Sequence, residues 1–459
     1  MKSVAFHNLG CKVNSYEMDV MQQFLQKSGY EIVSFNQKAD IYIINTCTVT
    51  NVADRKSRQM IHRAKKQNPD AIVVAVGCYV QTAAERIGED DCIDLAIGNN
   101  RKKDIVAIVE EFLAQRRDAS ASEGSAGTPD KTLAGTTIPD IAKENEYEEM
   151  QMETTAEHTR AYIKVQDGCN QFCSYCVIPY ARGRVRSRRP EHVVQEVRTL
   201  AKAGYKEVVL TGIHLSSYGL DFRGEAYNVT QSSDLLDLIE KVHAVDGICR
   251  IRLGSLEPRI VTESFAKRLS ELPKICPHFH LSLQSGCDSV LERMNRRYTC
   301  TEFAEGVRIL REYFEHPAIT TDVITGFPGE TEEEFAQTVE FLEQIKFFEM
   351  HVFPYSKREG TVAAAMPDQL TEKIKKERSA RLLAMDRKYS EDYRRYYIGK
   401  EITVLFEQKQ TIEGREYYVG HTPDYVKVAV LSEEDIVNKE IRCLATDMLC
   451  EDTVFAQKN

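Results

Sequence analysis

Three cysteines lie close together in the segment GCNQFCSYC, where Cys169, Cys173 and Cys176 have the spacing CxxxCxxC. Three thiolates at this spacing can ligate three irons of a 4Fe–4S cluster and leave the fourth iron open to another ligand. Soft thiolates select iron–sulfur clusters or zinc over hard metals. A zinc site usually has a fourth Cys or His nearby, and none is obvious around this motif. The spacing therefore favours an iron–sulfur cluster with one open iron.

A second group of three cysteines, Cys11, Cys47 and Cys78, is spread over the first 80 residues or so. Each follows an apolar run that is typical of a buried parallel strand. These runs are Val4–Leu9, Ile41–Asn45 and Ile72–Val76. Neighbouring parallel strands that end together would bring the three thiols to one edge of the sheet. Three ligands again leave one iron open, so that a sulfur or another exogenous ligand can bind there. The alternative interpretation is three buried structural cysteines.

The strands that carry the second group alternate with amphipathic stretches, such as Ser15–Ser28 and Val52–Gln67. Together with a fourth possible strand, Asp94–Ile97, they predict a small α/β domain with a parallel sheet over residues 1–114. Residues 115–158 are rich in Ser, Ala, Gly, Thr and Glu, and residues 119–158 carry a net charge of −7. Such a segment offers little apolar surface to offset its ordering entropy, so we interpret it as a flexible linker.

The first group of cysteines lies in a region, residues 159–397, that repeats a strand–helix pattern six times. Repeated βα units imply a parallel sheet with right-handed crossovers, and six units can form a partial (β/α)6 barrel. Ligands are then expected at the carboxyl ends of the strands. The strands are predicted at Ala161–Gln166, Glu207–Thr211, Arg250–Gly254, Phe279–Leu283, Ile319–Ile324 and Glu349–Phe353. Helical patterns separate them at His192–Ala203, Leu235–Val245, Phe303–Phe314 and Glu332–Ile345, and a charged helix follows at 371–397.

The last 62 residues, 398–459, contain short β runs such as ITVLF, YVKVAVL and DTVFA. They predict a small antiparallel β-barrel of the size used for oligonucleotide binding. Residues 400–459 are acidic by five charges, which suits a basic protein partner better than RNA, although a small basic face can exist on an acidic domain. Candidates for that face are Lys400, Lys409, Arg415, Lys427 and Arg442.

The composition of the chain indicates the compartment in which the protein works. Its 459 residues carry a net charge of −10, and no apolar stretch approaches the roughly 20 residues that span a bilayer. The N-terminus enters a strand-like run without a secretory signal, so we expect a cytoplasmic protein. Disulfides are unfavourable there, and the other cysteines are interpreted as packing or incidental thiols. They are Cys92, Cys249, Cys276, Cys287, Cys300, Cys443 and Cys450.

The two cysteine groups, in this order, carry a resemblance to a known family. NLGCKVNSYE, INTCTVTNVADRKSR and VGCYVQ, followed by the CxxxCxxC motif and RGRVRSR, resemble the methylthiotransferases of the radical S-adenosylmethionine (SAM) superfamily. LSLQSGCDSVLERMNRRYT and TDVITGFPGETEEEF continue the resemblance, and the C-terminal region looks like the TRAM domain of that family. The match extends over the whole chain except the 115–158 segment.

The resemblance implies two 4Fe–4S clusters and SAM as cofactors, with Cys11, Cys47 and Cys78 holding one cluster and Cys169, Cys173 and Cys176 the other. It implies that SAM bound at the cluster of Cys169, Cys173 and Cys176 is cleaved to a 5′-deoxyadenosyl radical. This radical activates an aromatic C–H bond that no side-chain acid or base can readily deprotonate. A methylthio group built from sulfur at the first cluster is then transferred. The chemistry is carried by the clusters and SAM, with no catalytic side chain assigned.

Further residues are expected to bind SAM. Tyr175 occupies the position at which the family places an aromatic side chain beside adenine. Polar or glycine-rich turns follow the predicted barrel strands, and glycines let the backbone approach a ligand closely. The residues of these turns expected at the cofactor are Thr211, Gly212, His214, Ser255, Glu257, Gln284, Ser285, Gly286, Gly326, Phe327 and Gly329.

Within the family, LGCKVNSYE looks most like the enzymes that modify C2 of N6-threonylcarbamoyladenosine at position 37 of tRNA, in the anticodon loop. Methylthiolation of isopentenyladenosine in tRNA or of a ribosomal-protein side chain are the alternatives, and a non-catalytic iron–sulfur RNA-binding protein is an alternative of another class. The resemblance also implies a flavodoxin- or ferredoxin-like electron donor and a source of sulfur.

Two basic runs are candidates for contacts with RNA phosphates. The first follows the CxxxCxxC motif and has no acidic residue; some of its members could equally bind the cofactor carboxylate. It consists of Arg182, Arg184, Arg186, Arg188 and Arg189. The second extends from Arg55 to Lys66. A solvated basic face without a ligand is the alternative interpretation of both runs.

Overall fold

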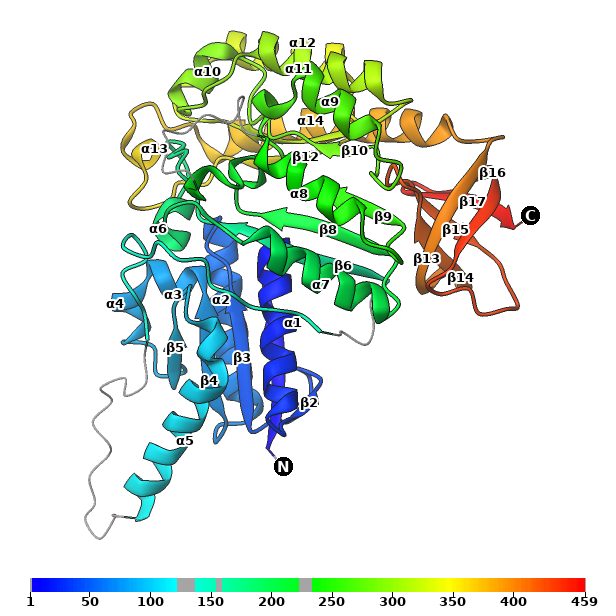
Figure 1. Ribbon diagram of the computed structural model, residues 1–459. Helices are drawn as coiled ribbons and strands as arrows, with labels where there is room; N and C mark the ends of the chain where they lie inside the picture. The colour runs from blue at the N-terminus through cyan, green and yellow to red at the C-terminus, as the bar shows by residue number, and fades with distance from the viewer. Residues whose placement is uncertain (1, 122–136, 154–158, 223–232, 459) are drawn as a thin grey trace. The chain divides into compact units, whose positions relative to one another are not determined.

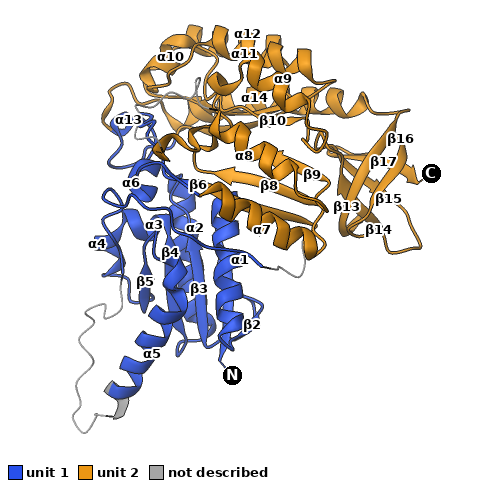
Figure 2. Ribbon diagram, viewed as in Figure 1, with its two compact units in different colours: residues 1–155, 166–188, 356–364 blue, residues 156–165, 189–355, 365–459 orange. Residues whose placement is uncertain are grey.

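A computed structural model describes residues 2–121, 137–153, 159–222 and 233–458 (Figure 1). The chain divides into two compact units, which are discontinuous in sequence (Figure 2). Unit 1 comprises residues 1–155, 166–188 and 356–364, and unit 2 comprises residues 156–165, 189–355 and 365–459. Among the described residues, none of the helices combines the length and the apolar character that crossing a membrane requires.

The core of unit 1 is a parallel sheet of order β2-β1-β3-β4-β5. Its strands are β1 (Ser3–Asn8), β2 (Glu31–Val33), β3 (Ile41–Thr46), β4 (Ile72–Gly77) and β5 (Leu95–Ile97). The four strands expected from the sequence are confirmed, whereas the short edge strand β2 was not predicted. β3 and β4 are buried at every position, because helices cover both faces of a parallel sheet (Figure 1). The helices are α1 (Lys12–Lys27), α2 (Asn51–Gln67), α3 (Cys78–Thr82), α4 (Ala84–Ile87) and α5 (Ile105–Ala121).

Part of the segment interpreted as a flexible linker is ordered in unit 1, which corrects that prediction. α5 continues to residue 121, and residues 137–153 pack against the N-terminal sheet and α1. Thr137 pairs with Ile97 at the edge of the sheet, and the Tyr16 hydroxyl donates to the Met150 carbonyl at 2.5 Å. Ile141, Met150 and Met152 are buried. These scattered apolar residues anchor a segment whose average composition is polar. Residues 122–136 and 154–158 lie outside the described residues.

Unit 2 contains the predicted partial barrel. Strands β6, β8 and β9 form one sheet and β10, β11 and β12 another, and parallel bridges between the ends of β9 and the β10 region join them. The strands are β6 (Arg160–Asp167), β8 (Glu207–Gly212), β9 (Arg250–Leu253), β10 (His278–His280), β11 (Ala318–Thr325) and β12 (Glu349–Pro354). All six agree with the sequence prediction. The last two residues of β6 belong to unit 1, where they pair with β7 (Arg186–Ser187).

The barrel helices begin where the sequence provides capping side chains. Thr299 and Thr331 each form a reciprocal capping box with the glutamate three residues later, Glu302 and Glu334, which satisfies otherwise unpaired N–H groups at the helix start. The helices of the barrel region are α6 (Ile178–Arg182), α7 (Pro190–Lys202), α8 (Asp234–His243), α9 (Glu263–Ser270), α10 (Asp288–Arg293), α11 (Cys300–Tyr313), α12 (Glu332–Ile345), α13 (Val362–Ala365) and α14 (Glu372–Arg395).

The C-terminal region forms the predicted small barrel, of order β13-β14-β15-β17-β16. Its strands are β13 (Glu401–Ile412), β14 (Arg415–His421), β15 (Lys427–Val430), β16 (Glu440–Cys450) and β17 (Thr453–Lys458). The pairs are antiparallel, except that β15 and β17 are parallel. The barrel closes around a buried apolar cluster that includes Val404, Val428 and Val454.

A buried ion network joins the C-terminal barrel to the amino ends of β6, β8 and β9 within unit 2. Glu207 accepts from Arg252 Nε at 2.8 Å and lies 2.6 Å from Arg160 Nε. Arg160 also reaches Glu407 of β13, at 2.7 Å, and both guanidinium groups lie over the ring of Tyr425. The network therefore occupies the end of the strands opposite to the one where ligands are expected.

Replacing Glu207 by glutamine should destabilise the protein at neutral pH and weaken its acid dependence. Burial alone would raise the pKa of Glu207, but Arg252 and Arg160 lower it from 4.5 to about 2. A carboxyl whose folded pKa is depressed contributes stability above its unfolded pKa and loses that contribution as the pH falls toward its folded pKa. The variant leaves Arg252 and Arg160 buried with one carboxylate partner fewer, which lowers the free energy of unfolding by about 3–5 kcal/mol.

This expectation can be measured by urea unfolding of the wild type and the Glu207→Gln variant between pH 7 and pH 3. The variant Glu434→Gln is a matched control, because Glu434 pairs with Lys458 in the same unit but is largely exposed. If the free energy of unfolding fell equally with pH in the wild type and the Glu207→Gln variant, Glu207 would not be the source of the acid dependence.

Candidate iron–sulfur site

Cys11, Cys47 and Cys78 lie at the carboxyl ends of β1, β3 and β4, which are adjacent strands of the unit 1 sheet. Cys11 is the residue before α1, Cys47 follows the last residue of β3, and Cys78 is the first residue of α3. The structure thus brings the three cysteines to one edge of the sheet, as the strand pattern predicted. Cys47 and Cys78 are buried, whereas Cys11 is exposed to solvent.

The backbone at this edge requires two glycines. Gly10 has φ +114°, and a Cβ there would lie 3.2 Å from Cys47 Sγ. Gly77 has φ +97°, and a Cβ there would lie 2.6 Å from Asn45 Oδ1. A side chain at either position would be strained and would displace a neighbouring polar or sulfur atom. The glycines before Cys11 and Cys78 therefore allow the loops to approach each other closely.

The surroundings of Cys47 and Cys11 raise the pKa of both thiols. Burial raises the pKa of the Cys47 thiol to about 11, and Cys78 and Cys11 add to the rise. Burial also raises the pKa of Cys11, whose side chain reaches solvent but has dense protein packing on its other sides; Arg182 opposes that rise. Metal binding to such thiols must release protons. The thiols follow adjacent strands of the sheet, which makes them neighbours.

The CxxxCxxC motif forms a loop between β6 and α6, within unit 1. Cys169 N–H donates to the Gly183 carbonyl at 3.0 Å, and Cys176 N–H donates to the Cys173 carbonyl at 2.9 Å. The Gln171 N–H donates to Cys169 Sγ at 3.4 Å. Cys169 is buried, and Cys173 and Cys176 are partly exposed. Backbone hydrogen bonds therefore hold the loop in place, and the Cys169 sulfur already accepts a hydrogen bond from an N–H group.

Arg182, six residues after Cys176, connects this loop to the N-terminal cysteines. Its side chain is fully buried. Its Nε donates to Cys78 Sγ at 3.3 Å, and its Nη atoms donate to Glu17 Oε1 at 2.8 Å and to Asp167 Oδ2 at 3.1 Å. Nη2 also donates to Asn14 Oδ1 at 2.5 Å. One guanidinium group therefore bonds the start of α1, a cysteine of the first group and the strand that leads into the second.

The arginines predicted to contact RNA separate into buried and exposed members. Arg182, Arg186 and Arg188 are fully buried. Arg186 donates to the Arg184 carbonyl at 3.1 Å, and Arg188 donates to Glu149 at 2.6 Å. Arg184 and Arg189 are exposed. Burial removes the first three from a surface that RNA could reach, so the prediction of RNA contact remains for Arg184 and Arg189.

In unit 2, the rim of the barrel brings together two of the residues expected at SAM. His214 Nε2 lies 3.3 Å from Glu257 Oε2, and His214 Nδ1 lies 2.6 Å from Ser217 Oγ. Glu257 also pairs with Arg259. Thr211 and Gly212 end β8 beside this group, while Ser255 is exposed.

The other predicted rim residues lie in less accessible places. Ser285 Oγ lies 3.3 Å from Thr338 Oγ1 of α12, and Gly286 packs on the same helix. Phe327 is buried against Tyr355, at 5.5 Å between ring centroids. Gly326 donates to Glu330, and Gly329 donates to the Asp368 carbonyl. Gln284 has φ +71° and continues the pairing with β11. Tyr175 is partly exposed in the CxxxCxxC loop of unit 1. For these residues the role in SAM binding stays a prediction.

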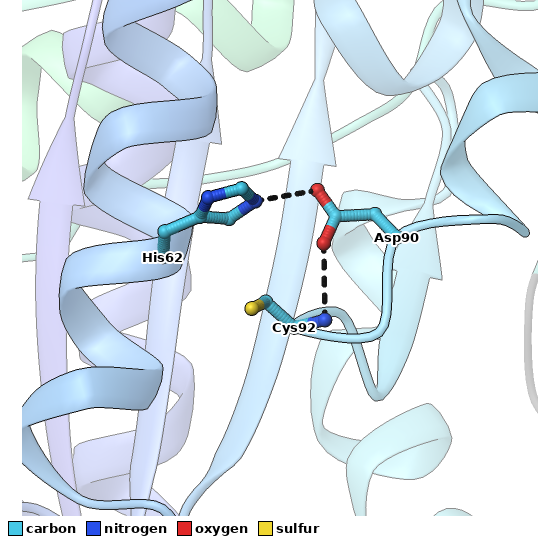
Figure 3. Close-up of side chains that lie close together, drawn as sticks. All are labelled: His62, Asp90 and Cys92. Carbon is cyan, nitrogen blue, oxygen red and sulfur yellow. Dashed lines mark hydrogen bonds and ion pairs between the residues drawn. The ribbon is translucent and has the colours of Figure 1, made fainter.

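Cys92 lies in a different kind of cluster, on the surface of unit 1 (Figure 3). Asp90 joins the other two members: its Oδ2 lies 2.9 Å from His62 Nε2, and its Oδ1 accepts from the Cys92 N–H at 3.0 Å. This arrangement caps a turn, and the His62 side chain is 55% exposed. The mixed set of ligand atoms differs from the two groups of three thiols, in agreement with the interpretation of Cys92 as an incidental cysteine.

Sequence reasoning did not identify the polar side chains that surround Cys78. Asn99 Nδ2 donates to Cys78 Sγ at 3.7 Å and to the Ala181 carbonyl at 2.7 Å. Lys102 is fully buried and pairs with Glu17. The available sequence signal is the position of Glu17 at helical spacing from the apolar residues Val13 and Met21 of α1, since a charge on the buried face of a helix requires a partner.

The donor sets fit the groups that the sequence predicts. Each cysteine group offers three sulfur ligands, and N–H donors from Arg182, Asn99 and Gln171 already point at two of the sulfurs. Hydrogen bonds to ligand sulfurs stabilise iron–sulfur clusters and adjust their reduction potential. Structurally, the two triads are held in one compact unit.

Comparisons with known proteins give consistent matches. Residues 163–342 match the radical SAM superfamily, and residues 3–98 match Uncharacterized protein family UPF0004. The chain is 40% identical over 444 residues to the threonylcarbamoyladenosine tRNA methylthiotransferase MtaB of Bacillus subtilis, covering 96% of this chain and 93% of that protein. It is 35% identical over 404 residues to the tRNA-2-methylthio-N(6)-dimethylallyladenosine synthase of Moorella thermoacetica, covering 87% of this chain and 85% of that protein.

A solved structure has a similar fold. The radical SAM methyltransferase TsrM from Kitasatospora setae, solved with cobalamin and a [4Fe-4S] cluster bound, superimposes with a TM-score of 0.54. The match covers 77% of this chain and 72% of TsrM at 18% identity, which establishes the similarity of the fold alone.

Proposed function

The chain belongs to the methylthiotransferase family of radical S-adenosylmethionine enzymes, and from that membership we propose that it adds a methylthio group to C2 of N6-threonylcarbamoyladenosine in tRNA. It is accordingly a transferase that uses 4Fe–4S clusters and SAM. Three relatives named for threonylcarbamoyladenosine are 40%, 42% and 35% identical to this chain, whereas relatives named for dimethylallyladenosine are 32% to 35% identical. This difference favours the threonylcarbamoyl substrate over the isopentenyl one.

The structural observation that supports the proposal best is the common location of the two cysteine triads in unit 1. Residues 166–188 fold with the N-terminal sheet and not with the remainder of the barrel. Arg182 bonds both Cys78 and Asp167, which lies two residues before Cys169. Sulfur insertion requires that the site of radical formation and the site that delivers sulfur be held together, and proximity of this kind lowers the barrier substantially.

The bound clusters and SAM supply the radical and the methylthio group for a C–H bond that side chains cannot deprotonate. The chain's own residues hold and orient these groups. The CxxxCxxC loop and the sheet edge each present three thiols, and Arg182 and Asn99 donate to the Cys78 sulfur. We assign His214 and Glu257, paired at the rim of the barrel, to polar contacts with SAM.

Contact with RNA is proposed for exposed basic and aromatic residues of unit 1. Arg184 lies over the Phe172 ring at 4.5 Å, and Phe172 contacts Tyr180, which is 53% exposed. Exposed aromatic and arginine side chains stack unpaired bases. Arg55, Lys56 and Arg58 of α2 are exposed as well and can neutralise phosphates. These residues of unit 1 suit the anticodon loop at position 37, and RNA contact by Arg189, which belongs to unit 2, is a separate proposal. A flavodoxin- or ferredoxin-like protein is the proposed electron donor.

Deleting the gene should remove 2-methylthio-N6-threonylcarbamoyladenosine from total tRNA and leave N6-threonylcarbamoyladenosine in its place. Liquid chromatography and mass spectrometry of tRNA nucleosides measures both, and a plasmid copy of the wild-type gene should restore the product. Loss of the methylthiolated isopentenyl nucleoside alone would overturn the substrate assignment.

The remaining alternatives are separated by two further measurements. Peptide mass spectrometry of ribosomal proteins from the same strains should show no change, and a lost methylthio group there would favour the protein substrate. The anaerobically reconstituted, reduced protein should cleave SAM to 5′-deoxyadenosine. Failure to do so in preparations with a full iron content would favour a non-catalytic RNA-binding protein.

A further inference from the structure

Two histidines and an aspartate lie together on one face of strands β10, β11 and β12, within unit 2. His280 pairs with Thr320 in the register of the sheet, and Asp322 pairs with His351. Thr320 and Asp322 are two residues apart on β11, so all four side chains share one face. His280 Nε2 lies 3.3 Å from Asp322 Oδ2, and His280 Nδ1 lies 3.0 Å from Thr320 Oγ1. The ring centroids of His280 and His351 are 5.7 Å apart. We call His280, Asp322 and His351 the His–Asp–His cluster.

This face of β11 is the one that turns away from the helices. The intervening residues of β11 point to the helix layer: Thr325 Oγ1 lies 2.7 Å from Ser379 Oγ of α14, and Ile319 lines a cavity with Phe348 and Tyr393. In a (β/α) barrel the opposite face of the strands is the interior. The His–Asp–His cluster therefore belongs to the inner surface of the partial barrel, on its last three strands.

The cluster is accessible to a ligand. His351 is exposed, and the side chains of Asp322 and His280 are 29% and 11% exposed. Phe353, two residues after His351 and thus on the same face of β12, is 45% exposed. An exposed aromatic ring on the inner face of a barrel offers a flat apolar surface beside three polar groups. A nucleobase with a polar substituent has the matching shape.

We propose that the His–Asp–His cluster binds the threonylcarbamoyl substituent on N6 of the target adenine, an inference that rests on the function proposed above. His351 donates a hydrogen bond to the threonyl carboxylate. Asp322, held in place by His280, accepts from the threonyl hydroxyl or a ureido N–H. Phe353 packs against the base.

The charge state of Asp322 agrees with its role as an acceptor. Although burial by itself raises the pKa of Asp322, the hydrogen bond from His280 and the nearby His351 and Arg296 keep that pKa below its usual value. Asp322 is therefore an ionised acceptor at neutral pH. An isopentenyl group would leave this carboxylate and His351 facing hydrocarbon, and a site built to bond a polar substituent rejects an analogue that lacks it.

A divalent metal is the competing ligand, since two imidazoles and a carboxylate also form a ligand set for iron or zinc. The geometry favours the nucleoside substituent. Both ring nitrogens of His280 lie within hydrogen-bonding distance of protein oxygens, one from Thr320 and one from Asp322. Metal binding would have to break the His280–Asp322 contact.

The test compares the full-length, anaerobically reconstituted enzyme with the variants His351→Phe and Asp322→Asn. The substrates are anticodon stem-loop RNAs whose target adenine carries either the threonylcarbamoyl or the isopentenyl group. Each variant should lower kcat/KM for the threonylcarbamoyl RNA by roughly 10- to 100-fold, the value of a lost hydrogen bond to a charged group. The preference over the isopentenyl RNA should fall by a similar factor. His192→Phe, which replaces an exposed histidine of α7 in the same unit, should change neither.

Two controls distinguish the possible failures. Reductive cleavage of SAM without RNA should be the same in the wild type and both variants, and metal analysis should find no zinc or iron beyond the clusters. An unchanged substrate preference in both variants, or a bound metal that both variants lose, overturns the inference while the proposed function stands. A wild-type enzyme that modifies only the isopentenyl RNA instead overturns the proposed function.

Discussion

Replacing Cys11, Cys47 and Cys78 together by alanine should abolish methylthiolation and leave the reductive cleavage of SAM intact. The three thiols come from the ends of adjacent strands, so the triple variant removes all protein ligands of one cluster. Iron content should fall from about eight to about four atoms per chain, as expected for the loss of one of two 4Fe–4S clusters. Anaerobic reconstitution, iron analysis and chromatography of 5′-deoxyadenosine measure these quantities.

The complementary triple variant of Cys169, Cys173 and Cys176 should lose both activities. Its iron content should also fall by about half, because the ligands of the other cluster remain. Cys92→Ala serves as the control, since that thiol belongs to the surface cluster with His62 and Asp90. If the first triple variant retained all its iron and its methylthiolation, the sulfur-insertion account would fail.

The first triple variant should still fold, which makes the experiment informative. Arg182 loses its contact with the Cys78 sulfur but keeps its bonds to Glu17 and Asp167. Among the described residues, that change leaves the Arg182 guanidinium and its carboxylate partners paired. Retained SAM cleavage then reports a folded CxxxCxxC loop, because residues 166–188 pack in the same unit as the altered cysteines.

The sequence predicted the strands and both cysteine groups because each depends on local patterns. An apolar run followed by Gly-Cys, as before Cys78, specifies a buried strand and a tight turn with little reference to the rest of the chain. The six barrel strands were found in the same way. The edge strand β2 was missed, since three residues carry too little pattern to distinguish a strand from a loop.

The sequence did not allow us to predict which distant segments of the chain contact one another. A run of five arginines without an acidic residue predicts a solvated or nucleic-acid-binding surface, whereas Arg182, Arg186 and Arg188 are buried in the structure. Their carboxylate partners come from segments as distant as α1 and residues 137–153. The same holds for the assignment of residues 166–188 to unit 1, which depends on long-range packing.

The His–Asp–His cluster could have been found from sequence with one additional step. Charged or imidazole side chains at interior positions of three predicted strands, as at Asp322 in TTDVIT, are unfavourable unless they serve a site. Their common face, however, depends on the register between strands. That register is set by the whole barrel and not by any one strand.

Replacing Arg182 by methionine should destabilise unit 1 by about 3–5 kcal/mol, the cost of removing one partner from a buried ionic group. Glu17 keeps Lys102, whereas the side chain of Asp167 is 3% exposed and its contact with Arg186, at 3.9 Å, is longer than its contact with Arg182, at 3.1 Å. The buried carboxylate of Asp167 thus loses its closest cation. The chain has no tryptophan, so far-UV circular dichroism in urea is the suitable probe.

Two further variants determine whether charge is the cause. Adding Asp167→Asn to Arg182→Met should recover part of the lost stability, because the buried negative charge that Arg182 compensated is then removed as well. Arg308→Met is the matched control: Arg308 pairs with Glu305 and Glu312 on the surface of α11, and its loss should change stability far less, because exposed ion pairs contribute little. Equal stabilities of the Arg182 and Arg308 variants would show that the buried guanidinium does not hold unit 1 together.

The conservative variant Arg182→Lys separates the fold from the cluster. Lysine keeps the charge near Glu17 and Asp167, so unit 1 should be destabilised less than by methionine. It lacks the Nε–H that donates to Cys78 Sγ at 3.3 Å. A hydrogen bond to a ligand sulfur stabilises the more negative, reduced cluster, so its loss should lower the reduction potential of the cluster at Cys11, Cys47 and Cys78. A redox titration followed by electron paramagnetic resonance measures that shift, and an unchanged potential in a fully loaded Arg182→Lys protein would exclude this role for the bond.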